Sequence, residues 1–404
     1  MNLVEKHIVR RSDPRYKDLM ELCHLSKNLY NVVLYTIRQH WFKTEKDDTV
    51  SKKFLNYYDV WKLLKNDKDY KAVGGHSAQH VIKQVETAFS SFFSLLNLKS
   101  KGKYSKRVKL PRYLPKDGYN MICFDQFKKK ELEDGFITLL KSKTLRFRIR
   151  NRNIHFISVV PKNDYVQVNF IYKKQEPEPK PDNGRYMGID LGVGNLATCA
   201  SNVARSIIID GKPVKHINRF FNKKISEVKR ELAKKNGKKH SRRTRQITLK
   251  RNCKIDDYFH KASRKIINYA TSNDIRTIIV GHNVDWKKGT DLGEENNQNF
   301  VCMPHDRLIH MLKYKGKLEG ITVIEVEEGY TSKCSFLDDE TIESHVKYSG
   351  KRSRRGLFRS SSGKLINADV NGAFNIMRKG LKRNRDAVRP ADVGFVYNPV
   401  KTRV

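Results

Sequence analysis

A chain of 404 residues, 38% of them hydrophobic, is long enough to bury a sizeable core in two or three domains. Its formal net charge of +39, from 82 Lys and Arg against 43 Asp and Glu, favours a polyanionic partner. No apolar run has the length of a transmembrane helix and no signal peptide is recognisable, so we expect a soluble, intracellular protein. The six cysteines are scattered without a CxxC pair, which supports neither a disulfide framework nor a zinc knuckle.

The N-terminal half is predicted to be β-rich with a helical insertion. Apolar residues recur at helical spacing over 17–40 and over 77–98. A basic, aromatic-dotted loop at 99–113 is followed by short alternating segments between 121 and 173, which are typical of antiparallel strands. The alternating prolines of 175–184 favour an extended linker, so we place the main domain boundary there.

The second half is predicted to be a mixed sheet covered by helices. Its order is three strands, two helices, strand, helix, strand, helix. Strands are expected at 185–192, 195–201, 204–211, 275–281 and 321–329, and helices at about 218–236, 243–272 and 303–318. Residues 333–366 are predicted to form a polar, basic loop before a last helix that Asp369 opens.

Two aspartates are candidates for metal chemistry. A nuclease with two divalent metals needs carboxylates from separate chain segments, and Mg²⁺ takes oxygen ligands. Asp190 ends an apolar strand and is followed by glycines, which let a phosphate-bearing chain approach closely. An ordinary turn residue is the alternative for Asp190. Asp369 lies where an acid also serves as a helix N-cap, and the two roles can coexist.

A third acid is expected from a more distant strand. The strand predicted to lie beside that of Asp190 ends in Gly281, without an acid, and the next strand ends in Glu325, Glu327 and Glu328. Alternation places Glu328 on the more apolar face. Adjacent strands lie about 4.8 Å apart, so its carboxylate has farther to reach. Glu328 is the predicted third ligand; a solvated strand end is the alternative for all three glutamates.

These motifs resemble those of the TnpB (OrfB) family, which bacterial and archaeal insertion sequences encode. The resemblance rests on GIDLGVGNLAT, PHDRLIHMLKYKGKLEGITVIEVEEGYTSK and INADVNGAFNIMRK, and on KNLYN, AFSSFF and KLPRYL in the N-terminal half. It implies an RNA-guided DNA endonuclease related to the type V CRISPR effectors. The implied fold is α/β and multidomain, with a wedge-like β-barrel and a nuclease domain of the RuvC-like RNase H fold.

The resemblance also implies domain limits. The barrel would span 1–174, with a helical, REC-like insertion at about 15–120. The nuclease domain would span 185–380, followed by a C-terminal tail at 381–404. The family often carries a four-cysteine zinc ribbon in the interval where this chain keeps Cys334 alone, so we predict a degenerate loop at 333–366 without structural zinc. His345 is either a lone ligand or a solvent-exposed side chain.

Carried over residue by residue, the first and last aspartates of the family fall on Asp190 and Asp369, and its usual middle Glu falls on Gly281. The chain is similar to a subgroup in which the Glu before YTSK, here Glu328, takes over. The implied cofactor is Mg²⁺ in a two-metal site, with Mn²⁺ as a substitute. The implied partners are guide RNA from the transposon end and double-stranded target DNA beside a short transposon-adjacent motif, in a cytoplasmic, nucleoid-associated setting. The oligomeric state is left open.

Basic side chains are predicted to contact phosphates, with a solvated charged face as the alternative. Ser77, Gln79 and Lys83 are predicted to read the adjacent motif from a groove. Arg264 and His260 are expected to meet a phosphate or to pair with an acid, and core packing is the alternative for His260. The predicted phosphate contacts are Lys103, Lys109, Arg112, Lys234, Lys235, Lys238, Lys239, Arg242, Arg243 and Arg264.

Three other functions compete with a guided nuclease. A nuclease-inactive, RNA-guided repressor would bind without cutting, and the presence of three suitable acids argues against it only if Glu328 substitutes for the missing acid. A DDE-type transposase would use three acids on an RNase H fold without RNA. A basic scaffold protein would carry its strand-end acids by accident.

Overall fold

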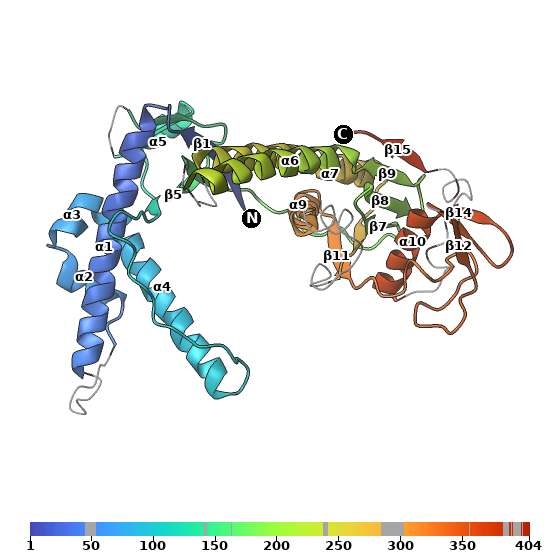
Figure 1. Cartoon of the computed structure of the whole chain (residues 1–404), viewed down its shortest axis with the longest axis horizontal. Coiled ribbons are helices and arrows are strands. Elements are labelled where there is room, and N and C mark those ends of the chain that lie inside the picture. The colour runs from blue at the N-terminus through green and yellow to red at the C-terminus, as the bar shows by residue number, and fades with distance from the viewer. Residues whose placement is uncertain are drawn as a thin grey trace. The chain divides into compact units, whose positions relative to one another are not determined.

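The computed structural model describes residues 1–44, 54–140, 144–162, 164–236, 241–283, 303–354, 356–382, 388, 390, 397 and 399–404. The chain forms two compact units, Met1–Gln175 and Glu176–Val404 (Figure 1). Across the described ranges, no helix is long and apolar enough to cross a membrane.

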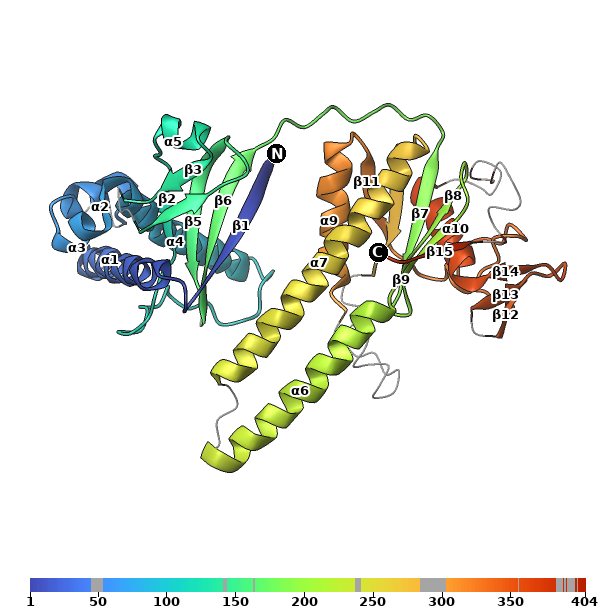
Figure 2. The ribbon, with the colours of Figure 1, turned by 90° about the horizontal axis from the view of Figure 1, so that it is seen from above.

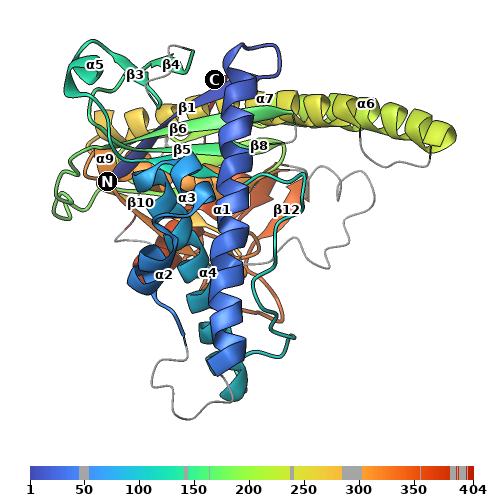
Figure 3. The same cartoon turned by 90° about the vertical axis from the view of Figure 1, so that its left-hand side faces the viewer.

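The two long helices predicted for unit 1 are confirmed (Figure 3). They are α1 (Arg15–Thr44) and α4 (Gly75–Ser100), and each buries its apolar stripe. The sequence pattern does not predict three shorter helices, because runs of 5 to 8 residues are too short to show a period. These are α2 (Tyr57–Leu64), α3 (Lys68–Val73) and α5 (Lys129–Glu133).

The sheet of unit 1 is antiparallel and open. Its order is β1-β6-β5-β2, with a separate β3–β4 hairpin, and no pairing among the described residues closes it into a barrel. The strands are β1 (Asn2–Arg10), β2 (Ile122–Phe124), β3 (Phe136–Thr138), β4 (Arg146–Arg148), β5 (Ile154–Pro161) and β6 (Tyr165–Lys173). Strand β1 is missed by the sequence pattern, because two of its less exposed alternate positions hold the polar pair Glu5 and His7, hydrogen-bonded at 2.9 Å.

Unit 2 contains the predicted mixed sheet, in the order β11-β10-β7-β8-β9-β15. Strand β8 is antiparallel to its neighbours β7 and β9, whereas β10 and β11 are parallel to β7. The carboxyl ends of β7, β10 and β11 therefore meet at one edge of the sheet. The strands are β7 (Tyr186–Leu191), β8 (Asn195–Ser201), β9 (Ile207–Asp210), β10 (Thr277–Gly281), β11 (Thr322–Val326) and β15 (Val400–Thr402).

Helices cover both faces of this sheet (Figure 2). One face packs on α7 (Arg242–Ser272) and α9 (His305–Leu318), and α6 (Lys212–Asn236) runs beside α7. The other face packs on α10 (Ala368–Leu381). Along β7, Met187 and Ile189 face the α7 and α9 side, so Gly188 and Asp190 face α10.

The prediction of an uninterrupted loop at 333–366 is wrong. The segment contains a three-stranded antiparallel sheet of β12 (Lys351–Arg354), β13 (Leu357–Arg359) and β14 (Leu365–Asn367). Its strands have only three or four residues, too few to show an apolar alternation. Phe358 and Ile366, each 1% exposed, anchor the small sheet in the core beneath α10.

Candidate active site

The site begins at the carboxyl end of β7, where α10 approaches closely. A Cβ on Gly188 would lie 2.0 Å from the carbonyl oxygen of Ala373, so the helix reaches the strand only because Gly188 has no side chain. A Cβ on Gly372 would lie 2.8 Å from Oδ2 of Asp190. Asp369 precedes Gly372 by one helical turn and therefore shares its face of α10. The packing of α10 on β7 thus brings the two aspartates together.

Asp369 is not the N-cap of its helix, and that prediction is wrong. The cap is Asn367, whose Oδ1 accepts hydrogen bonds from the backbone N–H groups of Asp369 at 3.0 Å and Val370 at 3.2 Å. The Asp369 carboxylate accepts instead from Nδ2 of Asn195 on β8, at 2.7 Å. Its place in the first turn of α10 favours its negative charge.

Gly281 lies beside Asp190 on the next strand. In the parallel ladder, Val280 of β10 pairs with Ile189 of β7, so the following residues, Gly281 and Asp190, are neighbours across the strands. On its outer side Gly281 pairs with Val326 of β11. The order of the strands therefore leaves a position without a side chain between Asp190 and the end of β11.

The Glu328 side chain fills that position. A Cβ on Gly281 would lie 2.5 Å from Oε1 of Glu328, 2.6 Å from its Cγ and 2.5 Å from Cδ1 of Ile376. Glu328 follows the end of β11 by two residues, and its side chain turns back over β10 towards α10. The chain after β11, the strand farther from Asp190, thus places the Glu328 carboxylate next to Asp190, because Gly281 has no side chain to fill that space.

The backbone of Glu328 is held on both sides. Its N–H donates to Oδ1 of Asn283 at 2.8 Å, and its carbonyl oxygen accepts from N and Oγ1 of Thr331 at 3.0 and 2.9 Å. Its Oε1 is buried and accepts no hydrogen bond from the described residues. Burial raises the pKa of Glu328 to about 7. A buried carboxylate oxygen without a donor is costly unless a cation neutralises it.

The other two glutamates of this strand end have different surroundings. Glu325 lies 3.1 Å from Nδ1 of His282 and forms an ion pair with Lys313 of α9, on the opposite face of the sheet. Glu327 is exposed. Of the three, Glu328 is the one whose side chain lies against Gly281.

The carboxylates interact electrostatically. Burial, together with the Glu328 and Asp369 carboxylates, raises the pKa of Asp190 well above its ordinary value, and Arg352 partly opposes this shift. A set of hard oxygen donors, one of them buried without a donor, fits Mg²⁺. Across the described ranges, no group of three acidic, His or Cys side chains lies close enough together to hold a metal ion.

A cavity of about 710 Å³ opens beside the two aspartates. The residues that line it carry both signs of charge, with two acids and four cationic side chains from three separate segments. The glycine-containing turn that follows β7 lines it as well, so a backbone-bearing substrate meets little steric obstruction there. The charged lining residues are Asp190, Asp369, Lys212, Lys215, Arg352 and Lys401.

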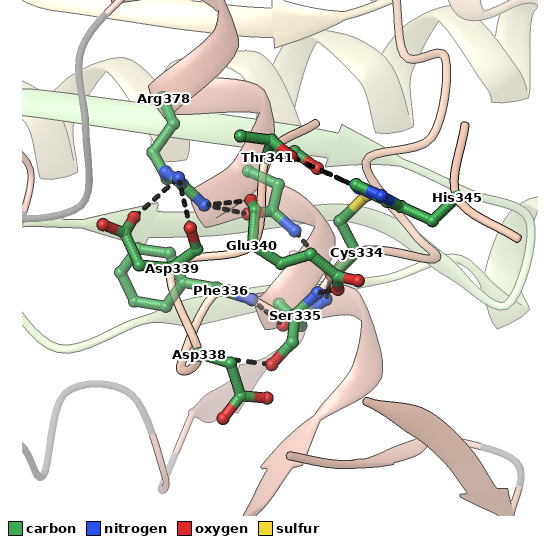
Figure 4. A network of polar contacts seen from close by, with 11 residues as sticks. Cys334, Ser335, Phe336, Asp338, Asp339, Glu340, Thr341, His345 and Arg378 are labelled. Atoms are coloured by element: carbon green, nitrogen blue, oxygen red, sulfur yellow. Dashed lines mark hydrogen bonds and ion pairs between the residues drawn. The ribbon is translucent and has the colours of Figure 1, made fainter. Parts of the chain in front are cut away.

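The loop after Glu328 is fastened to α10 by a network of polar side chains (Figure 4). Arg378, 6% exposed, donates to the carbonyl oxygens of Asp339 and Glu340 and lies 2.6 Å from Oδ1 of Asp339. The Glu340 carboxylate accepts from the backbone N–H groups of Ser335 at 2.6 Å and Ser349 at 2.7 Å. This network occupies the interval in which the sequence keeps a single cysteine.

Cys334 and His345 each have a partner within this loop. The Cys334 thiol donates to the carbonyl oxygen of Glu343 at 3.7 Å. Nε2 of His345 lies 2.8 Å from the carbonyl oxygen of Thr341. Neither side chain therefore has to bind a metal to be satisfied.

The predicted phosphate contacts lie mostly on the surface. Arg264 forms an ion pair with Glu319 at 3.1 Å, and Arg243 forms one with Glu231 at 3.3 Å. Lys238 and Lys239 lie outside the described residues. The exposed side chains of the predicted set are Lys103, Lys109, Arg112, Lys234, Lys235, Arg242 and Arg243.

The three predicted motif readers lie on α4 but differ in exposure. Ser77 is 5% exposed and lines a cavity of about 920 Å³. Gln79 and Lys83 line a second cavity, of about 630 Å³, and the Lys83 ammonium lies 5.4 Å from the centre of the Tyr57 ring. The reading of DNA by these residues stays a prediction.

Several residues of the site carry no signal that the sequence alone reveals. For Asn195, the one indication in the sequence is its place in the GVGNLAT motif, close to Asp190. Asn283, Arg352 and Lys401 come from segments far from Asp190 in sequence, and only the folded chain brings them to the cavity and to Glu328.

Two family models match the chain. The model described as a probable transposase, OrfB of IS605, matches residues 169–287. The model of the TNB domain of Cas12f1-like proteins matches residues 305–376. Together they cover the positions of Asp190, Glu328 and Asp369.

Curated relatives extend the similarity along the chain. The TnpB-like protein ORF457 of Acidianus two-tailed virus is 25% identical over 95% of this chain and 85% of its own length. The putative RNA-guided DNA endonuclease InsQ of Escherichia coli strain K12 is 24% identical over 81% of this chain and 80% of its own length. The CRISPR-associated endodeoxyribonuclease Cas12f2 of a Micrarchaeota archaeon is 28% identical over 54% of this chain and 40% of its own length.

Among solved structures, that of Cas12f1 with single-guide RNA and target DNA matches 93% of this chain and 99% of its own, with 16% identity and a TM-score of 0.36. The mini-RNA-guided endonuclease Cas_phi3 matches 94% and 92%, with 11% identity and a TM-score of 0.44. The fold and the site define a mixed α/β multidomain protein with acidic side chains gathered at the ends of parallel strands. Through these two family models and the curated relatives, the chain is similar to the TnpB/OrfB family and to Cas12f-like proteins.

Proposed function

We propose that this protein is an RNA-guided, metal-dependent DNA endonuclease whose catalytic ligands are Asp190, Glu328 and Asp369. The observation that carries the proposal is the Glu328 carboxylate lying over Gly281, next to Asp190. Two relatives, named as an RNA-guided DNA endonuclease and an endodeoxyribonuclease, support the same reaction class.

The chain supplies charge and position for this reaction. A divalent cation pair held by the three carboxylates would activate a water molecule and stabilise the leaving oxygen of the phosphodiester. Asn195 fixes one oxygen of Asp369, while Asn283 and Thr331 fix the backbone of Glu328. The cationic wall of the cavity places a phosphate opposite the acids.

Unit 1 is assigned the recognition role. In this proposal its sheet and helices form the wedge-like module with its helical lobe, and unit 2 forms the RuvC-like nuclease domain of RNase H fold. The partners are a guide RNA and double-stranded DNA beside a short adjacent motif. The excess of positive charge supports both partners, because phosphate contacts supply most nucleic-acid affinity.

The test uses the protein co-expressed with RNA from the flank of its own gene. The purified complex is incubated with a plasmid library, with and without Mg²⁺, and binding and cutting are scored separately. We expect Mg²⁺-dependent cuts that follow the guide, and we expect Glu328→Gln to bind RNA and target without cutting. Glu327→Gln is the matched control, because Glu327 is exposed at the same strand end.

The other outcomes each select a rival. Guided binding without cuts by the unaltered protein would identify a repressor with a broken site. Cutting or strand transfer without RNA would identify a transposase of the DDE type. Normal cutting by Glu328→Gln would show that another acid completes the site.

A further inference from the structure

The last residues of the chain form the outer strand of the sheet in unit 2. Strand β15 pairs in parallel with β9, with Lys401 opposite Ile208, and the backbone N–H of Val400 donates to the carbonyl oxygen of Ser206 at 2.9 Å. From α7, Nζ of Lys265 donates to the carbonyl oxygen of Arg403 at 2.8 Å. The C-terminal strand is therefore fixed to the sheet from two sides.

Strand β15 brings Lys401 to the cavity that Asp190 and Asp369 line. Its ammonium lies 3.5 Å from Oδ1 of Asp210, at the end of β9, and 47% of its side-chain surface faces solvent. Asp210 is 5% exposed and also accepts from the backbone N–H of Lys212 at 3.1 Å. Asp210 thus holds the Lys401 ammonium at the cavity wall while leaving part of it accessible.

Two further lysines line the same cavity. Lys212 and Lys215, at the start of α6, line it together with Lys401, so three ammonium groups from two segments belong to its lining. The acids Asp190 and Asp369 belong to the lining as well. A phosphodiester that reaches the acids therefore meets a cationic surface, which is the arrangement that holds a nucleic-acid backbone.

We propose that Lys401 is a substrate-positioning residue, which contacts a phosphate of the strand that enters the cavity and so makes the C-terminal strand part of the active site. This inference rests on the proposed nuclease function. The competing role for Lys401 is structural, namely to neutralise the buried Asp210 carboxylate. The two roles make opposite predictions for a double variant.

The test compares guided cutting of target plasmid by complexes of the full chain carrying Lys401→Ala, Lys401→Arg or Arg403→Ala. We expect Lys401→Ala to lower the single-turnover cutting rate about tenfold, the effect of losing one hydrogen bond to a charged group. Lys401→Arg should retain most of the rate. Arg403→Ala is the control, because Arg403 contributes a backbone contact to the strand and does not line the cavity.

The double variant Lys401→Ala with Asp210→Asn separates the two roles. If Lys401 only neutralises Asp210, removal of that charge restores cutting and thermal stability, and the inference is overturned. If Lys401 contacts phosphate, cutting stays low. Cutting by Lys401→Ala at the rate of the unaltered protein would also overturn it.

A second readout does not depend on cutting. Binding of a labelled single-stranded oligonucleotide is measured against salt concentration, and we expect Lys401→Ala to reduce the slope of log affinity against log salt by about 0.7, the loss of one phosphate contact. An unchanged slope counts against the inference. If the unaltered complex fails to cut, the proposed function fails, and the slope still decides whether Lys401 contacts phosphate.

Discussion

At the scale of single residues, the site depends on the absence of a side chain at Gly281. Glu328 occupies the space in which a side chain at 281 would begin, with its Oε1 only 2.5 Å from the position of a Cβ. An acid that grew from position 281 would therefore project into the same region as the Glu328 carboxylate. The two positions are alternative sources of one ligand, and they cannot both be occupied without displacement.

This geometry predicts that the third ligand can be moved between strands. Glu328→Ala should lower guided cutting about 100-fold or more, in the range seen when one preorganised electrostatic contact is removed from an active site. Adding Gly281→Glu to Glu328→Ala should recover at least about tenfold of that loss, because the new carboxylate starts where the old one ended. Cutting rates of the two variants, measured with RNA binding intact, provide the test.

The matched control is Gly281→Ala alone. A methyl group at 281 should displace Glu328 and Ile376 and reduce cutting without supplying a new ligand. If the double variant cuts no better than Glu328→Ala while remaining folded, the two positions are not interchangeable and the site lies elsewhere.

What the sequence predicts at this scale follows strand periodicity. The strand ends and their alternation make Asp190 a candidate and favour Glu328 over Glu325. Strand periodicity gives no information on contacts between distant segments, so it does not predict that Asn195 and Lys401 belong to the site. The N-cap assignment for Asp369 fails because Asn367, two residues earlier, offers a side-chain oxygen that reaches the same first turn.

At the scale of elements, α10 carries two tasks. Its first turn presents Asp369, and its later turns fasten the loop that follows Glu328. Nδ2 of Asn375 donates to the carbonyl oxygens of Thr331 and Cys334, and Arg378 holds Asp339 and Glu340 (Figure 4). Because α10 positions both Asp369 and the loop after Glu328, loss of its polar contacts should also disturb the site.

Arg378→Met should lower the free energy of unfolding of the chain by about 2–3 kcal/mol, because it removes the buried guanidinium that donates to the carbonyl oxygens of Asp339 and Glu340. Asp339→Asn, which keeps the hydrogen-bonded backbone, should lower the free energy of unfolding less.

Because side chains hold the loop after Glu328, treatment of the purified, RNA-free protein with a chelator should leave its urea midpoint of unfolding unchanged. A midpoint that falls on chelation would indicate a structural metal in this loop.

The long elements are predictable because their period repeats several times. Helices α1, α4 and α7 and strands β7, β8 and β10 follow directly from apolar spacing. Strands β12 to β14 do not, since each has at most four residues, and only Phe358 and Ile366 among them are buried hydrophobic residues. Strand β1 escapes because polar Glu5 and His7 stand at its less exposed alternate positions.

At the scale of the whole molecule, the proline-rich interval marks where the two units meet in sequence, and composition alone indicates a polyanionic partner. The pairing of residues 400–402 with β9 is beyond sequence patterns, because it joins positions that lie almost two hundred residues apart. The net charge of +39 is spread over both units, so the affinity for nucleic acid should arise from many weak phosphate contacts.

The ends of α6 and α7 offer a defined test of that distribution. Lys234 and Lys235, near the end of α6, and Arg242, at the start of α7, are exposed. Replacing all three by Gln should reduce the slope of log affinity for guide RNA against log salt by about two to three, since each lost phosphate contact contributes about 0.7–0.9.

The control replaces Lys128, Lys129 and Lys130 of unit 1 by Gln, which removes the same amount of charge from another part of the chain. If both triple variants change the slope equally, net charge rather than this helical surface governs binding; if only the first does, the two helices track the RNA.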